Sequence, residues 1–262
     1  MDFTHLHVHS HYSLMDGLCS PEELLLAAKK AGQTAMAITD HGTLASHRDL
    51  QIAAKKLGMK PILGLEAYIS ATDRFDKRDI KNRDDNTQVF NHISLLAKNQ
   101  AGLENLHKLS EIAWTEGYYR KPRIDLEVLD EYGDGLIILS GCMNGLIAKA
   151  LQNDNMDKAI EYAKWFHNRF EDDFYLEVQS HNDSIVNEGT KAISDKLGIS
   201  MVATGDCHYA TKSQKALEEV LLILSTKPNQ ATDTDYESGK KHKDIFERFN
   251  HLYPDRPISF QN

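Results

Sequence analysis

Seven short apolar segments alternate with longer amphipathic segments, and this alternation limits the possible folds more than any other feature of the sequence. The strand-like segments are 2–8, 34–39, 61–69, 92–97, 136–140, 173–179 and 200–205. The helix-like segments lie near 20–32, 44–57, 101–114, 156–170, 184–197 and 213–225. Strands that are mostly separated by helices are typical of a parallel α/β sheet. Periodicity alone leaves open both a doubly wound sheet and a closed barrel.

Two stretches interrupt this alternation. Residues 73–91 are charged and poor in apolar side chains, which predicts a mobile surface loop. Residues 226–262 are polar with weak helical patterning, so we expect a tail or adapter there. The sequence therefore predicts one main domain over 1–225, followed by that polar segment.

Length, charge and cysteine content narrow the class of protein. The chain has 262 residues and a formal net charge of −9, which argues against a broad basic surface that coats nucleic acid. An enzyme that grips a short stretch of nucleic acid is still compatible with this charge. No apolar run approaches the ~20 residues that span a bilayer, and nothing resembles a secretory signal. Three cysteines are too few for a disulfide framework, so we expect a cytoplasmic protein with free thiols.

The first strand-like segment continues into "HLHVHSHYSLMDG", which carries a histidine at every second position. In a strand, alternate side chains share a face, so His5, His7 and His9 point one way while Leu6 and Val8 point the other. Imidazole is a frequent ligand of zinc, iron and manganese. A strand with a few solvated histidines explains the pattern equally well, so other ligand-type residues have to decide.

Such residues follow the carboxyl end of nearly every predicted strand. They are His7, His9, Asp16, Asp40, His41, Glu66, His92, Cys142, Glu177, His181, Asp206 and His208. In parallel α/β barrels this edge is where functional sites are built. Scattered surface residues would not follow strand ends in this way, so the sequence predicts a metal site at that edge.

Several members of this set have a plainer interpretation. Asp40 either binds metal or orients its neighbour His41, and Glu177 alone could be a solvated strand residue. His92 is the weakest candidate, because it stands at the start of a strand. Cys207 points away from its neighbours and is expected to pack, and His5 is expected to be buried or to support a ligand. Ordinary surface histidines are expected at His11, His47 and His107.

A basic and aromatic stretch, "YYRKPRID", offers partners for a phosphate. Arginine can hold phosphate oxygens with two hydrogen bonds, although a single arginine is more often a solvated charge. The substrate-binding candidates are Tyr12, Arg120, Lys121, Arg123 and His181. We find no P-loop and no G-x-S-x-G motif, so no nucleophilic side chain of those classes is indicated.

Eight motifs together resemble a known family. They are "HLHVHSHYSLMDG", "AITDHG", "GLEAY", "NHISLLAKN", "EGYYRKPRID", "LSGCMNG", "FYLEVQSH" and "TGDCHY". In this order they resemble the PHP (polymerase and histidinol phosphatase) domain, and most closely the branch found at the N-terminus of bacterial DNA polymerase III alpha subunits. The resemblance covers roughly residues 2–225. Each motif is moderately specific, and the ordered set is highly specific.

This resemblance implies a distorted seven-stranded (β/α) barrel of TIM type with up to three metal ions at its carboxyl rim. The nine ligands that it implies are His7, His9, Asp16, His41, Glu66, His92, Cys142, Asp206 and His208. A donor set of imidazole, carboxylate and thiolate suits zinc, with manganese or iron as substitutes. All nine positions hold a residue able to bind metal, so residues 1–225 are expected to form a PHP metallo-phosphoesterase domain.

The resemblance also suggests the reaction. We expect hydrolysis of DNA phosphodiester bonds by a metal-bridging hydroxide, as a 3′–5′ exonuclease acting on a primer end. Two alternatives are a phosphatase for a small phosphomonoester such as histidinol phosphate, and a non-catalytic, metal-stabilised scaffold for replication proteins. The chain ends at Asn262, without room for palm, thumb and finger domains, so we expect a free-standing PHP protein or a fragment that does not polymerise DNA.

Overall fold

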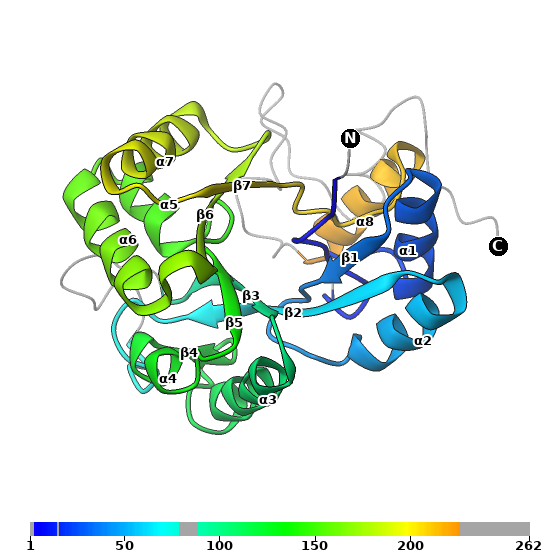
Figure 1. Cartoon of the computed structure of the whole chain (residues 1–262), viewed down its shortest axis with the longest axis horizontal. Coiled ribbons are helices and arrows are strands. Elements are labelled where there is room, and N and C mark those ends of the chain that lie inside the picture. The colour runs from blue at the N-terminus through cyan, green and yellow to red at the C-terminus, as the bar shows by residue number, and fades with distance from the viewer. Residues whose placement is uncertain (1–2, 15, 79–88, 226–262) are drawn as a thin grey trace, which may run out of the picture.

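The computed structural model describes residues 3–14, 16–78 and 89–225 (Figure 1). The strands are β1 (Ala35–Ile38), β2 (Lys60–Ile69), β3 (Asn91–Ala97), β4 (Arg123–Ile124), β5 (Leu136–Leu139), β6 (Phe174–Gln179) and β7 (Met201–Thr204). The α-helices are α1 (Pro21–Lys30), α2 (His47–Leu57), α3 (Gln100–Thr115), α4 (Leu126–Glu131), α5 (Leu146–Gln152), α6 (Met156–Phe170), α7 (Ser184–Leu197) and α8 (Lys215–Ser225). Two 3₁₀ turns, η2 (Glu171–Asp173) and η3 (Lys212–Gln214), precede β6 and α8.

The seven strands form one sheet in the order β1-β2-β3-β5-β6-β7, with β4 paired to β2. The pairs β1–β2, β2–β4, β5–β6 and β6–β7 are parallel, which confirms the predicted architecture. Strand β3 differs, because it runs antiparallel to both β2 and β5. Its first residues therefore lie at the edge where the parallel strands end, with Tyr68 of β2 opposite His92 of β3.

The N-terminal segment joins the two edges of this sheet. His5 forms a bridge to Met36 of β1, and Val8 forms a bridge to Cys207, which follows β7. The amide of Ala37 donates to the carbonyl of His5, and the amide of His9 donates to that of Cys207, each at 2.8 Å. The sheet thereby closes into the predicted distorted barrel. Residues 2–8 were expected to be a regular strand, but they alternate between two partners and contribute isolated bridges instead.

The helices lie around the outside of the barrel (Figure 1). One hydrophobic core cluster joins α3–α7 to the strands, and a second joins α1 and α2 to β1. Helix α1 begins with a capping box between Ser20 and Glu23, as the proline-led sequence indicates. Elements α4, α5 and β4 were not predicted, because with six, seven and two residues they are too short for a clear periodic signal.

The two ends of the barrel differ in polarity. At the end where β2 and β7 begin, an apolar cavity of about 500 Å³ is lined by Leu6, Ile62, Leu96, Leu139 and Val202, among others. At the opposite end lie buried polar side chains such as His7, His9 and Glu66. The buried candidate ligands therefore lie at the carboxyl rim of the parallel strands.

One expected region lies partly, and another wholly, outside the described residues. The residues concerned are 79–88, within the predicted surface loop, and all of the predicted tail at 226–262. Among the helices that the structure describes, none combines the length and apolar character required to cross a membrane.

Candidate metal centre

The structure brings all nine expected ligand residues to the carboxyl rim. His7 and His9 come from the N-terminal segment, and Asp16 comes from the loop that follows it. The others are His41 after β1, Glu66 within β2, His92 at the start of β3, Cys142 after β5, and Asp206 and His208 after β7. Residues separated by up to two hundred positions in sequence thus meet at one end of the barrel. Their role as metal ligands is our proposal, which rests on the geometry described next.

Glu66 lies at the centre of this group. Its Oε1 atom lies 3.2 Å from Nε2 of His7 and 3.0 Å from Nδ1 of His92. The Cys142 thiol donates to the same oxygen at 3.6 Å. Its Oε2 atom contacts Nδ1 of His41 and lies 3.7 Å from Nε2 of His9. One buried carboxylate is therefore surrounded by four imidazoles and a thiol.

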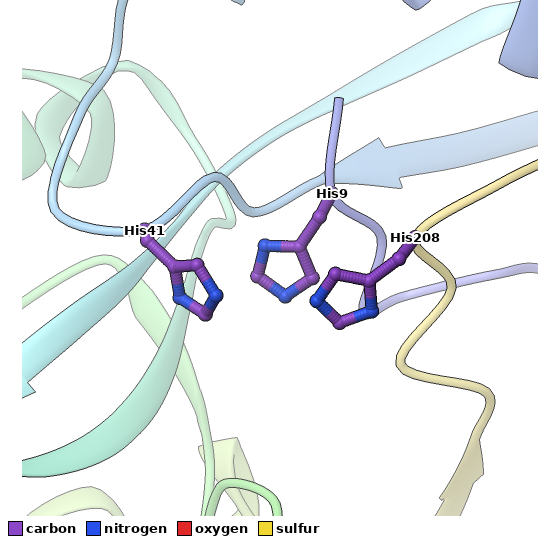
Figure 2. A group of neighbouring side chains, drawn as sticks. All are labelled: His9, His41 and His208. Atoms are coloured by element: carbon purple, nitrogen blue, oxygen red, sulfur yellow. The ribbon is translucent and has the colours of Figure 1, made fainter. Parts of the chain in front are cut away.

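Three imidazoles face one another beside this carboxylate. His9, His41 and His208 turn their rings toward a common space (Figure 2), and one ligand atom from each lies within 4.8 Å of the other two. Asp206 Oδ1 approaches His9 Nε2 at 3.2 Å, and Asp16 Oδ2 approaches His41 Nε2 at 3.1 Å. Two further groups satisfy the same spacing, His7–His9–Glu66 and His41–Glu66–His92. The three groups share members, so they form one compact cluster of donor atoms.

Unpaired buried atoms test whether this group suits a cation. Within the described part of the chain, ten buried side-chain nitrogen and oxygen atoms have no hydrogen-bond partner. Six belong to the nine residues: His7 Nε2, His9 Nε2, Asp16 Oδ1, His41 Nδ1, Glu66 Oε2 and Asp206 Oδ1. Buried polar atoms normally find partners, so a cluster of exceptions requires an explanation. Imidazole nitrogens and carboxylate oxygens that face one another without hydrogen-bond partners would suit divalent ions held between them.

The close carboxylates strongly perturb these imidazoles. Burial alone would lower the pKa of His41, but Glu66 and Asp16 raise that pKa to about 10. Burial and the nearby His41 lower the pKa of His9 to about 4, since two adjacent imidazoles do not both carry a proton. Burial also raises the pKa of the Cys142 thiol well above its ordinary value, with a further contribution from Glu66. Without a cation, the cluster therefore holds protons that a metal would displace.

Glu177, a strand residue with an open role in the sequence analysis, supports His7 from behind. Its Oε1 atom lies 2.7 Å from His7 Nδ1, and the amide of Gly141 donates to Oε2 at 3.1 Å. Gln179 donates to Oε1 at 3.0 Å. A carboxylate that accepts from one ring nitrogen directs the lone pair of the other nitrogen toward a metal. In the sequence, Glu177 and Gln179 are polar at alternate positions of a strand, which marks a shared face but does not show that this face is buried.

Asp40 supports the ligands rather than joining them. Its carboxylate accepts from the amide and hydroxyl of Ser10 and from the Ser13 hydroxyl, at 2.7–3.0 Å. Ser13 Oγ lies 3.0 Å from His9 Nδ1 and accepts from the amide of His41 at 3.1 Å. Of the two interpretations left open by the sequence, the structure favours the orienting role, although its hydrogen bonds lead to His9 as well as to His41.

Backbone conformation also holds the ligands in place. A Cβ atom on Gly17 would lie 1.9 Å from the Ser10 carbonyl oxygen, so glycine permits the tight loop that carries Asp16. Asp206 adopts a φ of 46°, a left-handed conformation that is costly for most side chains but tolerated by aspartate. This conformation directs its carboxylate at His7 and His9.

The antiparallel direction of β3 explains His92. In an all-parallel sheet, a residue at the start of a strand would lie at the end of the barrel opposite to the ligands. Because β3 runs the other way, His92 lies beside Tyr68 and reaches Glu66. The expectation that ligands gather at one edge of the sheet therefore includes His92, and only the assumed direction of its strand was wrong.

The rim candidates for substrate binding occupy different environments. Lys121 is exposed, and its Nζ lies 5.1 Å from the centroid of the Tyr68 ring, while the Arg120 guanidinium lies over Tyr119. The Tyr12 hydroxyl donates to Asp49 at 2.7 Å. His181 is exposed in the loop that follows β6. These residues stay candidates for contacts with substrate.

Arg123 corrects the sequence prediction. Its side chain is fully buried, with 0% exposure, and its guanidinium donates to the carbonyls of Gly117, Asp76, Val89 and Arg74. These bonds join the segment after β2, the start of β3 and the end of α3. Such a guanidinium has no surface to offer a phosphate, so the prediction that Arg123 contacts substrate is wrong.

Three further residues clarify the boundary of the site. Cys207 packs against the second core cluster, as predicted, and its Sγ lies 3.6 Å from Nδ1 of partly buried His5. His47 was expected on the surface but is buried, with Nε2 2.8 Å from the Gly64 carbonyl. The sequence did not show this burial, because a single histidine in a helix gives no indication of whether it faces the core or the solvent.

Comparisons with known proteins identify the family of this chain. The model of the PHP domain family matches residues 5–181. DNA polymerase III subunit alpha of Borreliella burgdorferi is 36% identical over 99% of this chain and 23% of its own length. The same subunit of Aquifex aeolicus is 40% identical over 86% of this chain and 20% of its own length. The chain thus spans about a fifth of the length of these curated relatives.

A solved structure supports the fold. A Bifidobacterium adolescentis protein described as a metal-dependent phosphoesterase aligns with a TM-score of 0.50 over 80% of this chain and 89% of its own, at 15% sequence identity. At this identity the likeness concerns the barrel architecture alone.

Proposed function

The chain belongs to the PHP domain family, and from this we propose that it is a metal-dependent phosphoesterase that hydrolyses DNA from the 3′ end. The observation that carries the proposal is the convergence of nine ligand-type side chains that leave six buried atoms without hydrogen-bond partners. Residues 1–225 would form the hydrolase domain, acting in the cytoplasm. Its partners would be primer ends and other replication proteins.

The proposed cofactor is a cluster of two or three divalent ions, with zinc first and manganese or iron as substitutes. Such ions would supply a hydroxide near neutral pH and neutralise charge on phosphate oxygens. Glu66, His9 and His41 each belong to two of the three ligand groups, so metal binding would depend most on these three residues.

The protein's own residues keep this site ready for that chemistry. Glu177 fixes the ring of His7, and Asp40 holds Ser13 against His9, so both imidazoles keep their orientation without a bound substrate. Lys121, beside Tyr68, offers a positive charge for a phosphate next to the reacting one. A small phosphomonoester has no such neighbouring phosphate, which is one reason to prefer DNA.

One observation favours a second candidate, a phosphatase for a small phosphomonoester. The formal net charge of −9 disfavours long contacts with a polyanion. The comparisons with polymerase subunits outweigh this point, because sequence identity of 36–40% concerns the same branch of the family.

An assay on labelled DNA tests the proposal. Protein loaded with zinc or manganese is incubated with oligonucleotides labelled at the 5′ end, and separately with a chromogenic phosphomonoester. We expect a ladder that shortens from the 3′ end and disappears in His9→Ala and Asp206→Asn. His107→Ala, at an exposed position on α3, serves as the control and keeps full activity.

The other outcomes are equally informative. Rapid hydrolysis of the phosphomonoester with intact DNA would favour the phosphatase. Stable metal content without hydrolysis of either substrate would favour the non-catalytic scaffold. Full activity in both ligand variants would contradict the assignment of the site.

A further inference from the structure

We propose that the stacked pair Trp114–Tyr118 is a platform for the bases of single-stranded nucleic acid beside the candidate metal centre. This inference rests on the proposed function, because it assigns the part of the substrate that lies next to the reacting phosphate. It concerns residues outside the nine ligand positions.

The pair has the geometry of a stacking surface. The ring centroids lie 5.6 Å apart with an interplanar angle of 20°, and the side chains are 52% and 50% exposed. The two residues are four positions apart, at the last turn of α3 and just beyond it. Large aromatic side chains that keep half of their surface in water lose the stabilisation that burial would give them. Here two such rings lie together on the surface.

The pair is attached to the loop that carries a candidate ligand. Trp114 Nε1 donates to the carbonyl of Gly42 at 3.0 Å, and Gly42 directly follows His41. Because β3 runs antiparallel, it leaves the rim, and α3 returns the chain to it. The C-terminal end of α3 therefore lies at the same edge as the metal ligands. A base on this platform would lie close to the space between His9, His41 and His208.

A positive charge stands on the loop that packs against Gly42. A Cβ atom on Gly42 would lie 2.9 Å from both Pro122 and the Tyr68 ring, so the "RKP" loop packs directly on this glycine. Tyr68 stacks on His41 with 6.0 Å between centroids, and Lys121 Nζ lies 5.1 Å from the Tyr68 centroid. The lysine amine is thus no more than about 11 Å from the His41 ring, which is the total of these two distances.

This combination favours a nucleic-acid strand over other occupants. Proteins that bind single strands pair aromatic surfaces for the bases with positive groups for the backbone. An apolar peptide that bound over the aromatic pair would be a poor match, because Arg120 and Lys121 stand beside this surface. Stacking does not require a particular base, so the platform would accept any sequence at a primer end.

Fluorescence provides a direct test, because the chain contains only two tryptophans. The other, Trp165, packs against Phe166 and Phe170, so Trp165→Phe leaves Trp114 as the single reporter. Metal-free protein is titrated with a short oligonucleotide and with an abasic strand of the same length and charge. We expect quenching by the first strand and weak or absent quenching by the second.

Binding measured by anisotropy in the wild-type background completes the test. Trp114→Ala and Tyr118→Ala should each weaken oligonucleotide binding by roughly 5- to 150-fold, the range expected for loss of one stacked base. Trp114→Phe keeps an aromatic ring and should retain most of the affinity. Ile52→Ala removes an exposed apolar side chain from α2 and should change nothing. Turnover of a chromogenic phosphoester should also be unchanged in Ile52→Ala, which lies outside the platform and the nine ligand positions.

The failure of this inference differs from failure of the proposed function. Equal binding of the normal and abasic strands, or unchanged binding in both alanine variants, overturns the platform even if the enzyme degrades DNA. This result would also be expected if the aromatic pair docks another protein. Absence of any phosphoester hydrolysis by the metal-loaded wild type overturns the proposed function, while the binding measurements still test the platform.

Discussion

Glu177 Oε1 lies 2.7 Å from His7 Nδ1, and both side chains are completely buried. An ionised carboxylate can only accept, so Nδ1 of His7 must carry the proton. Nε2 then faces Glu66 and Asp206, at 3.2 and 3.4 Å, and would offer its lone pair there to a bound cation. Glu177, on β6, therefore sets the orientation of the candidate ligand His7.

Replacing Glu177 by glutamine should weaken metal binding without loss of the fold. The amide can present an NH₂ group to His7 and favour the opposite tautomer, which removes the lone pair from the metal side. Loss of such a supporting carboxylate typically costs 10- to 100-fold in metal affinity. Titration of zinc against a competing chelator measures the effect. Glu188→Gln, at an exposed position on α7, is the matched control, and equal affinities in both variants would contradict the proposed role.

Asp40→Asn should lower the free energy of unfolding by about 2–4 kcal/mol, because it perturbs a buried carboxylate with several hydrogen bonds. Its oxygens accept from Ser10 and Ser13, and one NH₂ group in their place would face donors. Urea denaturation of the metal-free protein measures the change. Asp172→Asn, at an exposed position in η2, should remain within about 0.5 kcal/mol of wild type. A loss of that same small size in Asp40→Asn would show that the Ser13 connection is unimportant.

The elements that could be predicted from the sequence are those whose signals lie within a few neighbouring residues. Strand segments and helix α1 were predicted because apolar periodicity, capping residues and proline act within a few residues of one another. The ligand set could be proposed because strand ends meet at one edge. His92 showed the limit of this reasoning, since strand direction depends on pairing between distant segments.

Roles that depend on burial were not readable from the sequence. "YYRKPRID" presents Arg120, Lys121 and Arg123 as similar charges, yet Arg123 is buried and the other two are exposed. The same limit applies to Glu177, whose partner His7 is 170 residues away. Which polar residue turns inward is decided by tertiary packing, and no local pattern records it.

Zinc uptake by the metal-free protein should release a proton from His41. Its pKa is about 10 in the folded protein and 6.5 in an unfolded chain, so it is charged at pH 8. Divalent metals bind neutral imidazole, and the proton must leave. Calorimetric titration at pH 8 in two buffers of different ionisation enthalpy counts the protons. His41→Gln should release one proton fewer than wild type, and an unchanged count would contradict the assignment.

The same raised pKa predicts how pH affects the metal-free fold. A histidine whose pKa is raised by folding stabilises the protein fully below the unfolded value of 6.5, and this contribution disappears as pH rises through about 10. The urea midpoint of wild type should therefore fall between pH 7 and 10 by more than that of His41→Gln. Identical pH profiles for the two proteins would show that the imidazolium does not contribute.

Arg123 leads to a prediction in which stability and substrate affinity separate. Its guanidinium donates to four backbone carbonyls from three segments, and lysine cannot reach all of them. Arg123→Lys should therefore lower the free energy of unfolding by about 2–4 kcal/mol, as expected when buried acceptors lose charged donors. Arg48→Lys, at an exposed position on α2, is the control.

Below the unfolding temperature, Arg123→Lys should keep wild-type metal content and KM for DNA, whereas Lys121→Ala should raise KM and leave stability unchanged. A rise in KM with normal stability in Arg123→Lys would return this arginine to the substrate-binding surface.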